Sequence, residues 1–188
     1  TVTTPGGTAI SADEFTVAGG NRIFGPTAID TAIEISKAEY PDGSGRTASA
    51  VVLARSDYFS DALAGGPLAA HVNAPLLITP GTPESNELDP WVGDEIDRLL
   101  DPGQTVYVLG GPLAISVDVD ATLTNNGYSV QRVAGENMFA TAVAIANVIG
   151  QPSAIFEATG WNFPDALSAV PAAIKTKGVI LLTNNNVQ

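Results

Sequence analysis

The stretch AVVLARSDYFSDALAGGPLAA (residues 50–70) joins an apolar run to a segment rich in small residues. Its first part, Ala50–Ala54, is apolar without alternation, which is typical of a strand covered on both faces. Its last part, Phe59–Ala70, has an acidic residue near its start, where a helix exposes backbone N–H groups and the positive end of its dipole. The stretch therefore predicts a strand followed by a helix, the unit from which parallel sheets are built.

Nearly the same sequence motif, which we call the repeated phrase, occurs again later in the chain. FPDALSAVPAAI (residues 163–174) matches FSDALAGGPLAA (residues 59–70) at six of twelve positions. Upstream, RIFGPTAIDTAIEIS (residues 22–36) aligns with RVAGENMFATAVAIA (residues 132–146) at an offset of 110, which falls to 104 from residue 50 onward. The first copy therefore has six extra residues, in the loop around YPDGSGR (residues 40–46). A unit of about a hundred residues is too long for a solenoid repeat and suits a small domain.

Strand-length and helix-length segments alternate along the rest of the chain. Further apolar runs of strand length are Phe15–Gly19, Pro75–Thr79, Thr105–Gly110, Tyr128–Val133, Ala154–Ala158 and Gly178–Thr183. Helical spacing of apolar residues is found in Ala28–Ala38, Trp91–Leu100 and Phe139–Ile149. The order predicts an α/β fold, a Rossmann-like or flavodoxin-like parallel sheet with flanking helices, built from a tandem repeated unit.

The repeat also predicts a division of the chain. Residues 1–21 form a lead-in segment, flexible in its Thr- and Gly-rich opening, with the first strand, and residues 22–131 form the first repeat. Residues 132–188 form a second repeat that is incomplete at its C-terminus, because nothing after residue 183 matches the TVYVLGG strand of residues 105–111.

Composition excludes several classes of function. The chain has 20 acidic and 8 basic residues, a net charge of −12, so its surface repels nucleic acid phosphates. It lacks cysteine, which excludes disulfides, thiol catalysis and thiolate metal sites. No apolar run approaches the ~20 residues of a membrane span. With one isolated histidine, His71, and no Gly-x-Ser-x-Gly motif, we predict no enzyme, no metal and no cofactor.

Several short segments, taken in the order in which they occur along the chain, resemble the type-2 cell-wall-binding repeat of Gram-positive surface proteins. The matching segments are Arg-x-x-Gly with Thr-Ala (residues 22–32 and 132–142), Phe-Ser-Asp-Ala-Leu (59–63), Asn-Phe-Pro-Asp-Ala-Leu (162–167), the aliphatic runs 76–78 and 180–182, and Val-Tyr-Val-Leu-Gly-Gly (106–111). The chain departs from the family where a second arginine is usual: Ala28 stands there in one copy and Met138 in the other.

The resemblance implies a non-catalytic module in the cell wall or on the cell surface. Such a module anchors a surface or secreted protein to anionic wall polysaccharide, together with further repeats of the same protein or copies of itself. Two other functions stay open from the residues alone. One is a surface-layer or filament subunit, and the other is an α/β enzyme or nucleotide-binding domain with a deep pocket near Gly110.

The loops at the carboxyl ends of strands are the expected ligand site, because open α/β sheets bind ligands there. In the two copies these loops are Arg55–Tyr58 and Thr159–Asn162, and each combines an aromatic ring with polar groups, as carbohydrate sites do. The candidate ligand-binding residues are Arg22, Arg55, Ser56, Asp57, Tyr58, Asp61, Arg132, Thr159, Trp161, Asn162 and Asp165.

Several of these residues have a structural interpretation as well. Asp61 and Asp165 are expected first of all to cap helix starts, and Tyr58 and Trp161 can equally cover the core. Arg22 and Arg132 are suited to bridge a strand to an acidic neighbour. Within the repeated phrase, small residues around Pro67 predict close packing on another element, and Pro67 and Pro171 are expected to kink or restart their helices.

Overall fold

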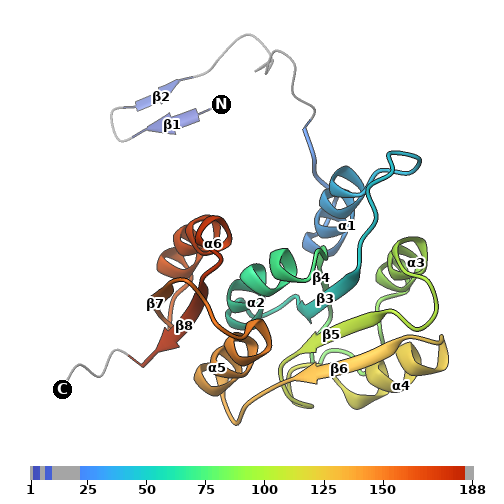
Figure 1. Ribbon diagram of the computed structural model, residues 1–188. Coiled ribbons are helices and arrows are strands. Elements are labelled where there is room, and N and C mark those ends of the chain that lie inside the picture. The colour runs from blue at the N-terminus through green and yellow to red at the C-terminus, as the bar shows by residue number, and fades with distance from the viewer. Residues whose placement is uncertain (1, 5–6, 10–21, 185–188) are drawn as a thin grey trace.

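The computed structural model describes residues 2–4, 7–9 and 22–184, and Figure 1 shows its ribbon. At the start of the chain, β1 (Val2–Thr4) pairs antiparallel with β2 (Gly7–Ala9). The expected flexible opening therefore contains a short strand pair, which agrees with the preference of Val and Thr for extended backbone. The strand predicted at Phe15–Gly19 lies outside the described residues.

The first sheet has four parallel strands in the order β4-β3-β5-β6. They are β3 (Ala50–Arg55), β4 (Leu76–Thr79), β5 (Thr105–Leu109) and β6 (Ser129–Val133). Central β3 is buried from Ala50 to Ala54, as its continuous apolar run predicts. The predicted parallel α/β sheet is thus confirmed.

The second sheet repeats part of the first. It consists of β7 (Ile155–Thr159) and β8 (Val179–Thr183), paired in parallel with Phe156 opposite Ile180. The equivalent pair in the first sheet, 104 residues earlier, is Val52 opposite Leu76. Each unit therefore contains the same strand–helix–strand element with the same register.

Within residues 22–184, six helices connect the strands. They are α1 (Ala28–Glu39), α2 (Ser60–His71), α3 (Pro90–Leu99), α4 (Val117–Asn125), α5 (Met138–Ile149) and α6 (Pro164–Thr176). The sequence patterns miss α4, which is rich in Val and Thr, residues of low helix propensity. Its start is nevertheless fixed by Ser116, whose side chain accepts a hydrogen bond from the Asp118 backbone N–H.

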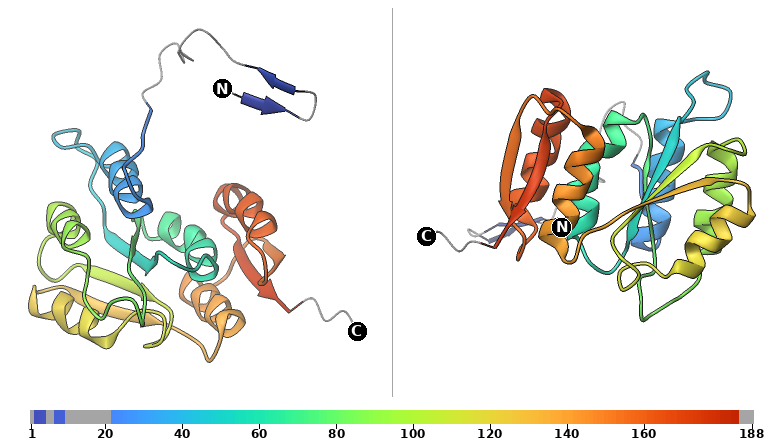
Figure 2. Two further views of the ribbon diagram at one scale, coloured as in Figure 1. Left: turned by 180° about the vertical axis from the view of Figure 1, so that it is seen from behind. Right: turned by 60° about the horizontal axis from the view of Figure 1, so that its bottom comes forward.

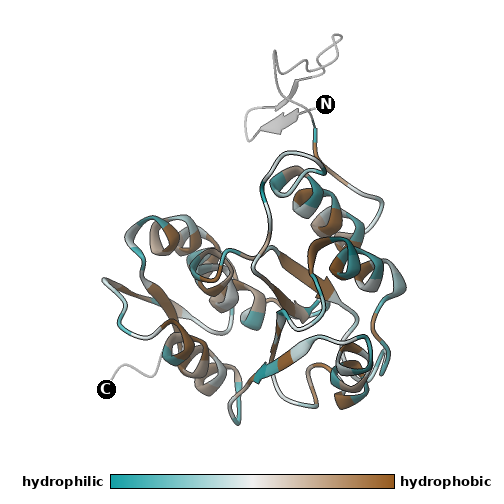
Figure 3. Ribbon diagram, turned by 45° about the vertical axis from the view of Figure 1, so that its right-hand side comes forward, coloured by the Kyte–Doolittle hydropathy of each residue, from teal (hydrophilic) through white to brown (hydrophobic). Residues whose placement is uncertain are grey.

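The first sheet separates two hydrophobic cores. Val51 and Leu53 of β3 face one core, which includes buried residues of α1, α3 and α4. Val52 and Ala54 face the other core, which continues across α2 into α5, α6 and β8. The strands of both sheets are among the more hydrophobic segments of the ribbon (Figure 3). The two repeats therefore share the second of these cores, the one that contains Val52 and Ala54.

Helix α2 lies at the junction of the two units. It contacts β3 on one side and α5, α6 and β8 on the other, and the views of Figure 2 show α2 and α5 between the two sheets. Its glycines permit this close packing: a Cβ on Gly65 would lie 2.3 Å from Leu109 Cδ1, and one on Gly66 would lie 3.0 Å from Val170 Cγ1. The predicted close packing of the small residues is confirmed.

Of the two expectations for Pro67 and Pro171, a kink or a restart of the helix, the restart is wrong. Both prolines lie inside helices that continue past them, α2 to His71 and α6 to Thr176. Proline removes one backbone hydrogen bond, but α2 is buried between two units, and burial of its apolar face outweighs that loss.

The Arg-x-x-Gly motif starts the same local structure in both copies. The backbone N–H of Gly25 donates to Thr31 Oγ1 at 3.0 Å, and that of Gly135 donates to Thr141 Oγ1 at 3.0 Å. In the second copy, however, Arg132 and Val133 of the motif belong to β6. The predicted division between residues 131 and 132 falls within this strand, so residues of the second sequence copy complete the first sheet.

Candidate functional site

A cavity of about 380 Å³ lies at the carboxyl ends of β3, β5 and β6, where α2 and α5 begin. Its walls are formed by the end of β3, the turns that follow β5 and β6, and the first residues of α2 and α5. The lining residues are Arg55, Tyr58, Ser60, Asp61, Gly110, Gly111, Pro112, Leu113, Ala114, Gly135, Glu136, Asn137, Met138 and Thr141. We call this the strand-edge cavity. It occupies the place where open α/β sheets bind ligands.

Arg55 and Asp57 form an ion pair in the loop after β3. Arg55 Nε donates to Asp57 Oδ1 at 2.8 Å, and Nη2 donates to Asp57 Oδ2. The hydrogen bond from Arg55 lowers the pKa of the Asp57 carboxyl, and the same bond raises the pKa of Arg55. The guanidinium also reaches the carbonyl oxygens of Leu113 and Thr82, both at 3.4 Å. The only cation in the cavity lining is thus already paired within the described residues.

Asp61 is buried at the base of the strand-edge cavity, against the backbone of Gly110. Gly110 has a φ of +91°, and a Cβ there would lie 2.6 Å from Asp61 Oδ2, so only glycine leaves room for the carboxylate. Burial raises the pKa of Asp61, while the charge of Arg55 partly offsets this effect. The carboxylate therefore faces the cavity.

The predicted capping role of Asp61 and Asp165 is wrong. Helices α2 and α6 begin after Phe59 and Phe163, and neither start has a side-chain cap hydrogen bond within the described residues. Each aspartate lies two residues after the N-cap, so the expected position in the first turn, near the positive end of the helix dipole, is confirmed although neither forms a cap hydrogen bond. Asp61 points into the cavity instead, and Asp165 is exposed.

Arg132 is a bridging residue below the cavity. Its Nε and Nη2 donate to the two carboxylate oxygens of Asp120, both at 2.8 Å, and Nη1 donates to the Gly110 carbonyl oxygen at 2.8 Å. Nη2 also reaches the Ser116 carbonyl oxygen at 3.1 Å. The arginine thus ties β6 to α4 and fixes the Gly110 turn. Its counterpart Arg22 lies over the ring of Phe24, 3.9 Å from the centroid, and does not line the cavity.

Aromatic rings continue from the cavity to the second unit. Tyr58 stacks on Phe59 with centroids 4.9 Å apart, and Phe59 meets Phe163 edge-on at 6.1 Å. Phe59 and Phe163 are equivalent positions of the two repeats, so the units touch at the same residue of the repeated phrase. Tyr58 is 41% exposed and Phe163 is 50% exposed. We call Tyr58, Phe59 and Phe163 the aromatic bridge.

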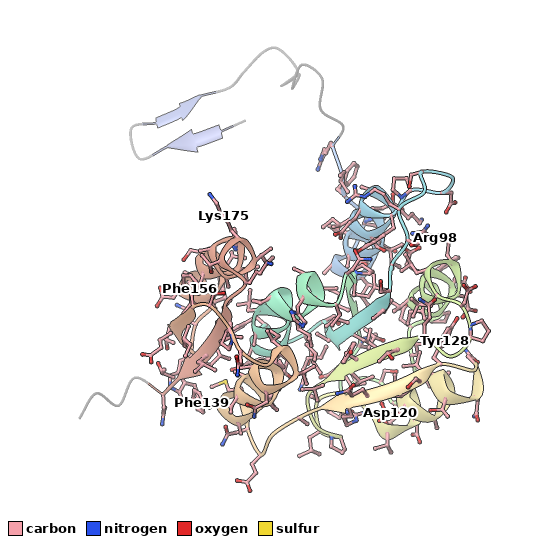
Figure 4. The ribbon with its side chains drawn as sticks, in the orientation of Figure 1. Arg98, Asp120, Tyr128, Phe139, Phe156 and Lys175 are labelled. Atoms are coloured by element: carbon pink, nitrogen blue, oxygen red, sulfur yellow. The ribbon has the colours of Figure 1, made fainter. Side chains whose placement is uncertain are left out.

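The predicted residues of the second loop gather beside α5. The Trp161 ring lies edge-on to Phe139 at 5.7 Å, and its Nε1 donates to Asn184 Oδ1 at 2.8 Å. The Trp161 backbone N–H donates to Thr159 Oγ1, and Asn162 Oδ1 accepts from the Phe163 backbone N–H. Phe139 is labelled in Figure 4, at the start of α5. With 61% of its surface exposed, Trp161 is not a lid over the core.

The predicted residues therefore divide into two groups. Arg55, Tyr58 and Asp61 line the strand-edge cavity, Ser56 and Asp57 lie in the same loop, and Arg132 supports the cavity from below. Arg22, Thr159, Trp161, Asn162 and Asp165 do not line it. The second loop lies outside the cavity, but Met138 adjoins both loops, since Tyr58 Oη lies 4.0 Å from Met138 Sδ and a Cβ on Gly160 would lie 3.1 Å from Met138 Cε.

Sequence reasoning missed the turn between β6 and α5, which supplies Glu136, Asn137 and Met138 to the cavity. Asn137 caps α5, since its Oδ1 accepts from the backbone N–H groups of Phe139 and Ala140, both at 3.0 Å. Met138 was visible as the position where the resembled family has arginine. This departure from the family pattern was the signal by which the sequence could have indicated the turn, because Met138 lies in the cavity wall.

The cavity is acidic overall. Asp61 and Glu136 line it, and Arg55 is neutralised by Asp57. Among the residues that the structure describes, no group of three or more His, Cys, Asp or Glu is placed to hold a metal ion. Within the same residues, none of the helices combines the length and apolarity needed to cross a membrane.

Comparison with known proteins gives a consistent picture. The model of the family "Cell wall binding domain 2" matches residues 22–120 and 132–188. The N-acetylmuramoyl-L-alanine amidase LytC of Bacillus subtilis is 31% identical over 87% of this chain and 31% of its own length. The amidase enhancer of the same species is 31% identical over 90% of this chain and 22% of its own length. The chain thus spans less than a third of these relatives.

Two solved structures share the fold. Cwp8 from Clostridium difficile superposes with a TM-score of 0.79 at 29% identity, over 88% of this chain and 28% of Cwp8. Cwp6 from the same species gives a TM-score of 0.77 at 23% identity, over 96% of this chain and 29% of Cwp6, which shows likeness of fold alone.

Proposed function

Since the chain belongs to the cell wall binding domain 2 family, we propose that it is a non-catalytic module that holds a surface or secreted protein on anionic wall polysaccharide. The strand-edge cavity and the aromatic bridge beside it form the contact surface. The observation that carries the proposal is the bridge itself: a row of rings that runs from exposed Tyr58 through half-buried Phe59 to exposed Phe163 of the second repeat, next to a cavity with polar walls.

The aromatic bridge and the cavity beside it provide the two kinds of contact that bind a sugar chain, ring faces and hydrogen-bond acceptors. Aromatic faces cover the apolar face of a pyranose ring, and nearby carboxylates and carbonyls accept hydrogen bonds from its hydroxyl groups. Tyr58 lies in both parts of the surface, since its ring stacks on Phe59 and its side chain lines the cavity. A chain of sugars crossing from the cavity to Phe163 would contact both repeats.

The charge of the cavity decides which part of the polymer enters it. Asp61 and Glu136 repel phosphate and carboxylate groups, so we assign the neutral rings and hydroxyl groups to this cavity. The same charge weighs against a nucleotide-binding domain, although the cavity does lie at Gly110, where that alternative expects a pocket. Among the described residues, Asp61 has a hydrogen bond with the Ser60 side chain but none with a His, Lys or second carboxylate that could exchange a proton with it, which supports binding without catalysis.

The test is cosedimentation with purified cell walls. Tyr58→Ala and Phe163→Ala each remove one ring and are expected to lower the wall affinity roughly fivefold, about 1 kcal/mol per ring. Trp91→Ala is the matched control, because Trp91 is 67% exposed on α3 but lies outside the bridge and cavity. Failure of the wild-type protein to sediment, or an equal loss with Trp91→Ala, would contradict the proposal.

One observation favours self-association as a second role. In the first sheet β3 is paired on both sides, by β4 and β5, whereas within the described residues its equivalent β7 is paired only with β8. An open strand edge is a template for pairing with another chain. Light scattering at increasing protein concentration tests this: a constant monomer mass would exclude assembly by this edge.

A further inference from the structure

A second cavity, of about 360 Å³, lies at the opposite end of the helices that border the strand-edge cavity. Helices α2 and α5 begin at the first cavity and end at the second, which places the two sites about 18 Å apart for twelve residues of helix. Its lining residues are Pro67, Ala70, His71, Ile149, Ala173, Ile174, Lys177 and Gly178. We call this the helix-end cavity.

The helix-end cavity differs from the others in charge. Its titratable lining residues, His71 and Lys177, are both basic, and no Asp or Glu lines it. The strand-edge cavity and the groove between α1 and α3 both carry carboxylates. On a chain of net charge −12, a cavity free of acidic lining residues is a place where an anion meets little local repulsion.

The basic groups of this cavity are available to a ligand. Arg55, Arg98 and Arg132 are each held in ion pairs at 2.8 Å or less. The side chains of His71 and Lys177, in contrast, make no hydrogen bond or ion pair with any residue that the structure describes. They do not cap the carbonyl groups at the ends of α2 and α6 either, which would be the ordinary role of basic residues there.

The backbone at Lys177 is unusual for a lysine. Lys177 has a φ of +53°, and its repeat equivalent Asn73 has a φ of +52°. The two helix ends are otherwise alike: Gly178 N–H donates to the Ala173 carbonyl oxygen, as Ala74 N–H donates to that of Ala69. Asparagine tolerates this left-handed conformation, whereas lysine adopts it at a cost.

The two equivalent side chains are used differently. Asn73 Nδ2 donates to the Thr47 carbonyl oxygen at 2.9 Å and so ties the helix end to a loop. Lys177 has no such structural bond among the described residues, and its side chain lines the cavity. The left-handed backbone serves the helix end in both copies, whereas the Lys177 side chain is left for the cavity.

We propose that the helix-end cavity binds an anionic group, a phosphate or a carboxylate carried on a sugar ring, with Lys177 supplying the positive charge and the His71 ring donating an N–H hydrogen bond. Pro67, Ile149 and Ile174 form the apolar wall against which the ring lies. The identity of the ligand as wall polymer rests on the proposed function. The strand-edge cavity then takes the neutral part of the chain and the helix-end cavity takes the charged substituent.

The test is a nuclear magnetic resonance titration of the whole chain with glucose 1-phosphate, glucuronate and uncharged glucose. Saturable shifts are expected at the backbone amides of His71 and Gly178 with the two anions, and none with glucose. Lys177→Asn is expected to weaken anion binding at least tenfold. It introduces the residue present at the equivalent helix end, so the thermal unfolding temperature is expected to stay the same or rise.

Lys175→Asn is the matched control. Lys175 precedes Lys177 by two residues, points away from the body of the molecule in Figure 4 and does not line the cavity. Lys175→Asn removes one positive charge, as Lys177→Asn does. Because Lys175 lies outside the cavity, its loss should change anion binding less than twofold. Equal binding by the wild-type protein and Lys177→Asn, or equal loss with Lys175→Asn, would overturn the proposal.

The outcome for this cavity is distinguishable from the outcome for the proposed function. If the wild-type protein sediments with walls and Lys177→Asn sediments equally well, the helix-end cavity plays no part and the wall-binding function stands. If the wild-type protein does not sediment but Lys177-dependent shifts appear with glucose 1-phosphate, the anion site stands and the wall function falls.

Discussion

Single residues at equivalent positions of the two repeats have acquired different environments. Asp61 is buried because the Gly110 turn covers it, whereas Asp165 is exposed. Arg132 is held by Asp120 of the neighbouring helix, whereas Arg22 lies over Phe24. The repeated sequence therefore fixes the local backbone, and neighbours from distant segments fix what each side chain does.

The buried carboxyl of Asp61 leads to a prediction about pH and stability. Burial raises its pKa above the ordinary value, so the folded state binds more protons than the unfolded state between the two values. This contribution to stability is therefore greatest at low pH and falls as the pH rises through the raised pKa.

Asp61→Asn removes the buried charge. At pH 7 the variant is expected to be more stable than the wild type by about 1 kcal/mol, the usual size of a single-site effect. The difference should shrink as the pH falls towards the ordinary aspartate value. Urea unfolding between pH 3.5 and 7 measures it, with the exposed Asp165→Asn as control, expected within about 0.5 kcal/mol of wild type. A constant difference at all pH values would refute the assignment.

Among the elements, α2 connects the two units, and its glycines set how closely they approach. Gly65 faces Leu109 of the first sheet and Gly66 faces Val170 of α6. Glycine is unfavourable inside a helix by about 1 kcal/mol relative to alanine, so its presence here reflects packing rather than helix propensity.

A pair of glycine substitutions separates packing from propensity. Gly65→Ala is expected to destabilise the protein by about 1–3 kcal/mol, because the new Cβ would lie 2.3 Å from Leu109 Cδ1 in a buried contact. Gly93→Ala in α3 is the control: its Cβ would meet only Leu88 Cδ2, at 3.6 Å, so it should stabilise by up to about 1 kcal/mol. Thermal unfolding of both variants tests this, and stabilisation by Gly65→Ala would show that the helix can move.

At the scale of the whole molecule, the shared core makes the two sheets one cooperative unit. Leu68 of α2 is fully buried in a cluster that also contains Val52 of β3 and Ile180 of β8. Removing either sheet would expose that face of α2 to water, so neither unit is expected to unfold alone.

The two tryptophans report on one unit each. Trp91→Phe leaves Trp161, just after β7 of the second unit, and Trp161→Phe leaves Trp91 in α3 of the first. Urea transitions of the two variants, followed by fluorescence, are expected to coincide, and Leu68→Ala should shift both by the same 2–5 kcal/mol. Separate transitions, or a shift in one alone, would mean that the repeats are independent.

The sequence by itself determined the repeat, the alternation of strands and helices and the family. These features depend on local patterns: apolar runs of strand length, caps such as Asp89 before Pro90, and glycines in turns. It also indicated the strand-edge loop of Arg55 and Tyr58, because the carboxyl end of a strand is fixed by the strand's direction.

Only the tertiary structure decided the rest. That Asp61 lies in a cavity rather than at a helix cap depends on Gly110, and that α2 serves both repeats depends on how the sheets pack. Met138 became part of a cavity wall, and Lys177 a candidate binding residue, only when folding placed them beside Asp61 and His71. The physical reason is that burial, charge neighbours and cavities arise from residues far apart in the chain, whereas the patterns of a sequence report only on residues a few positions apart.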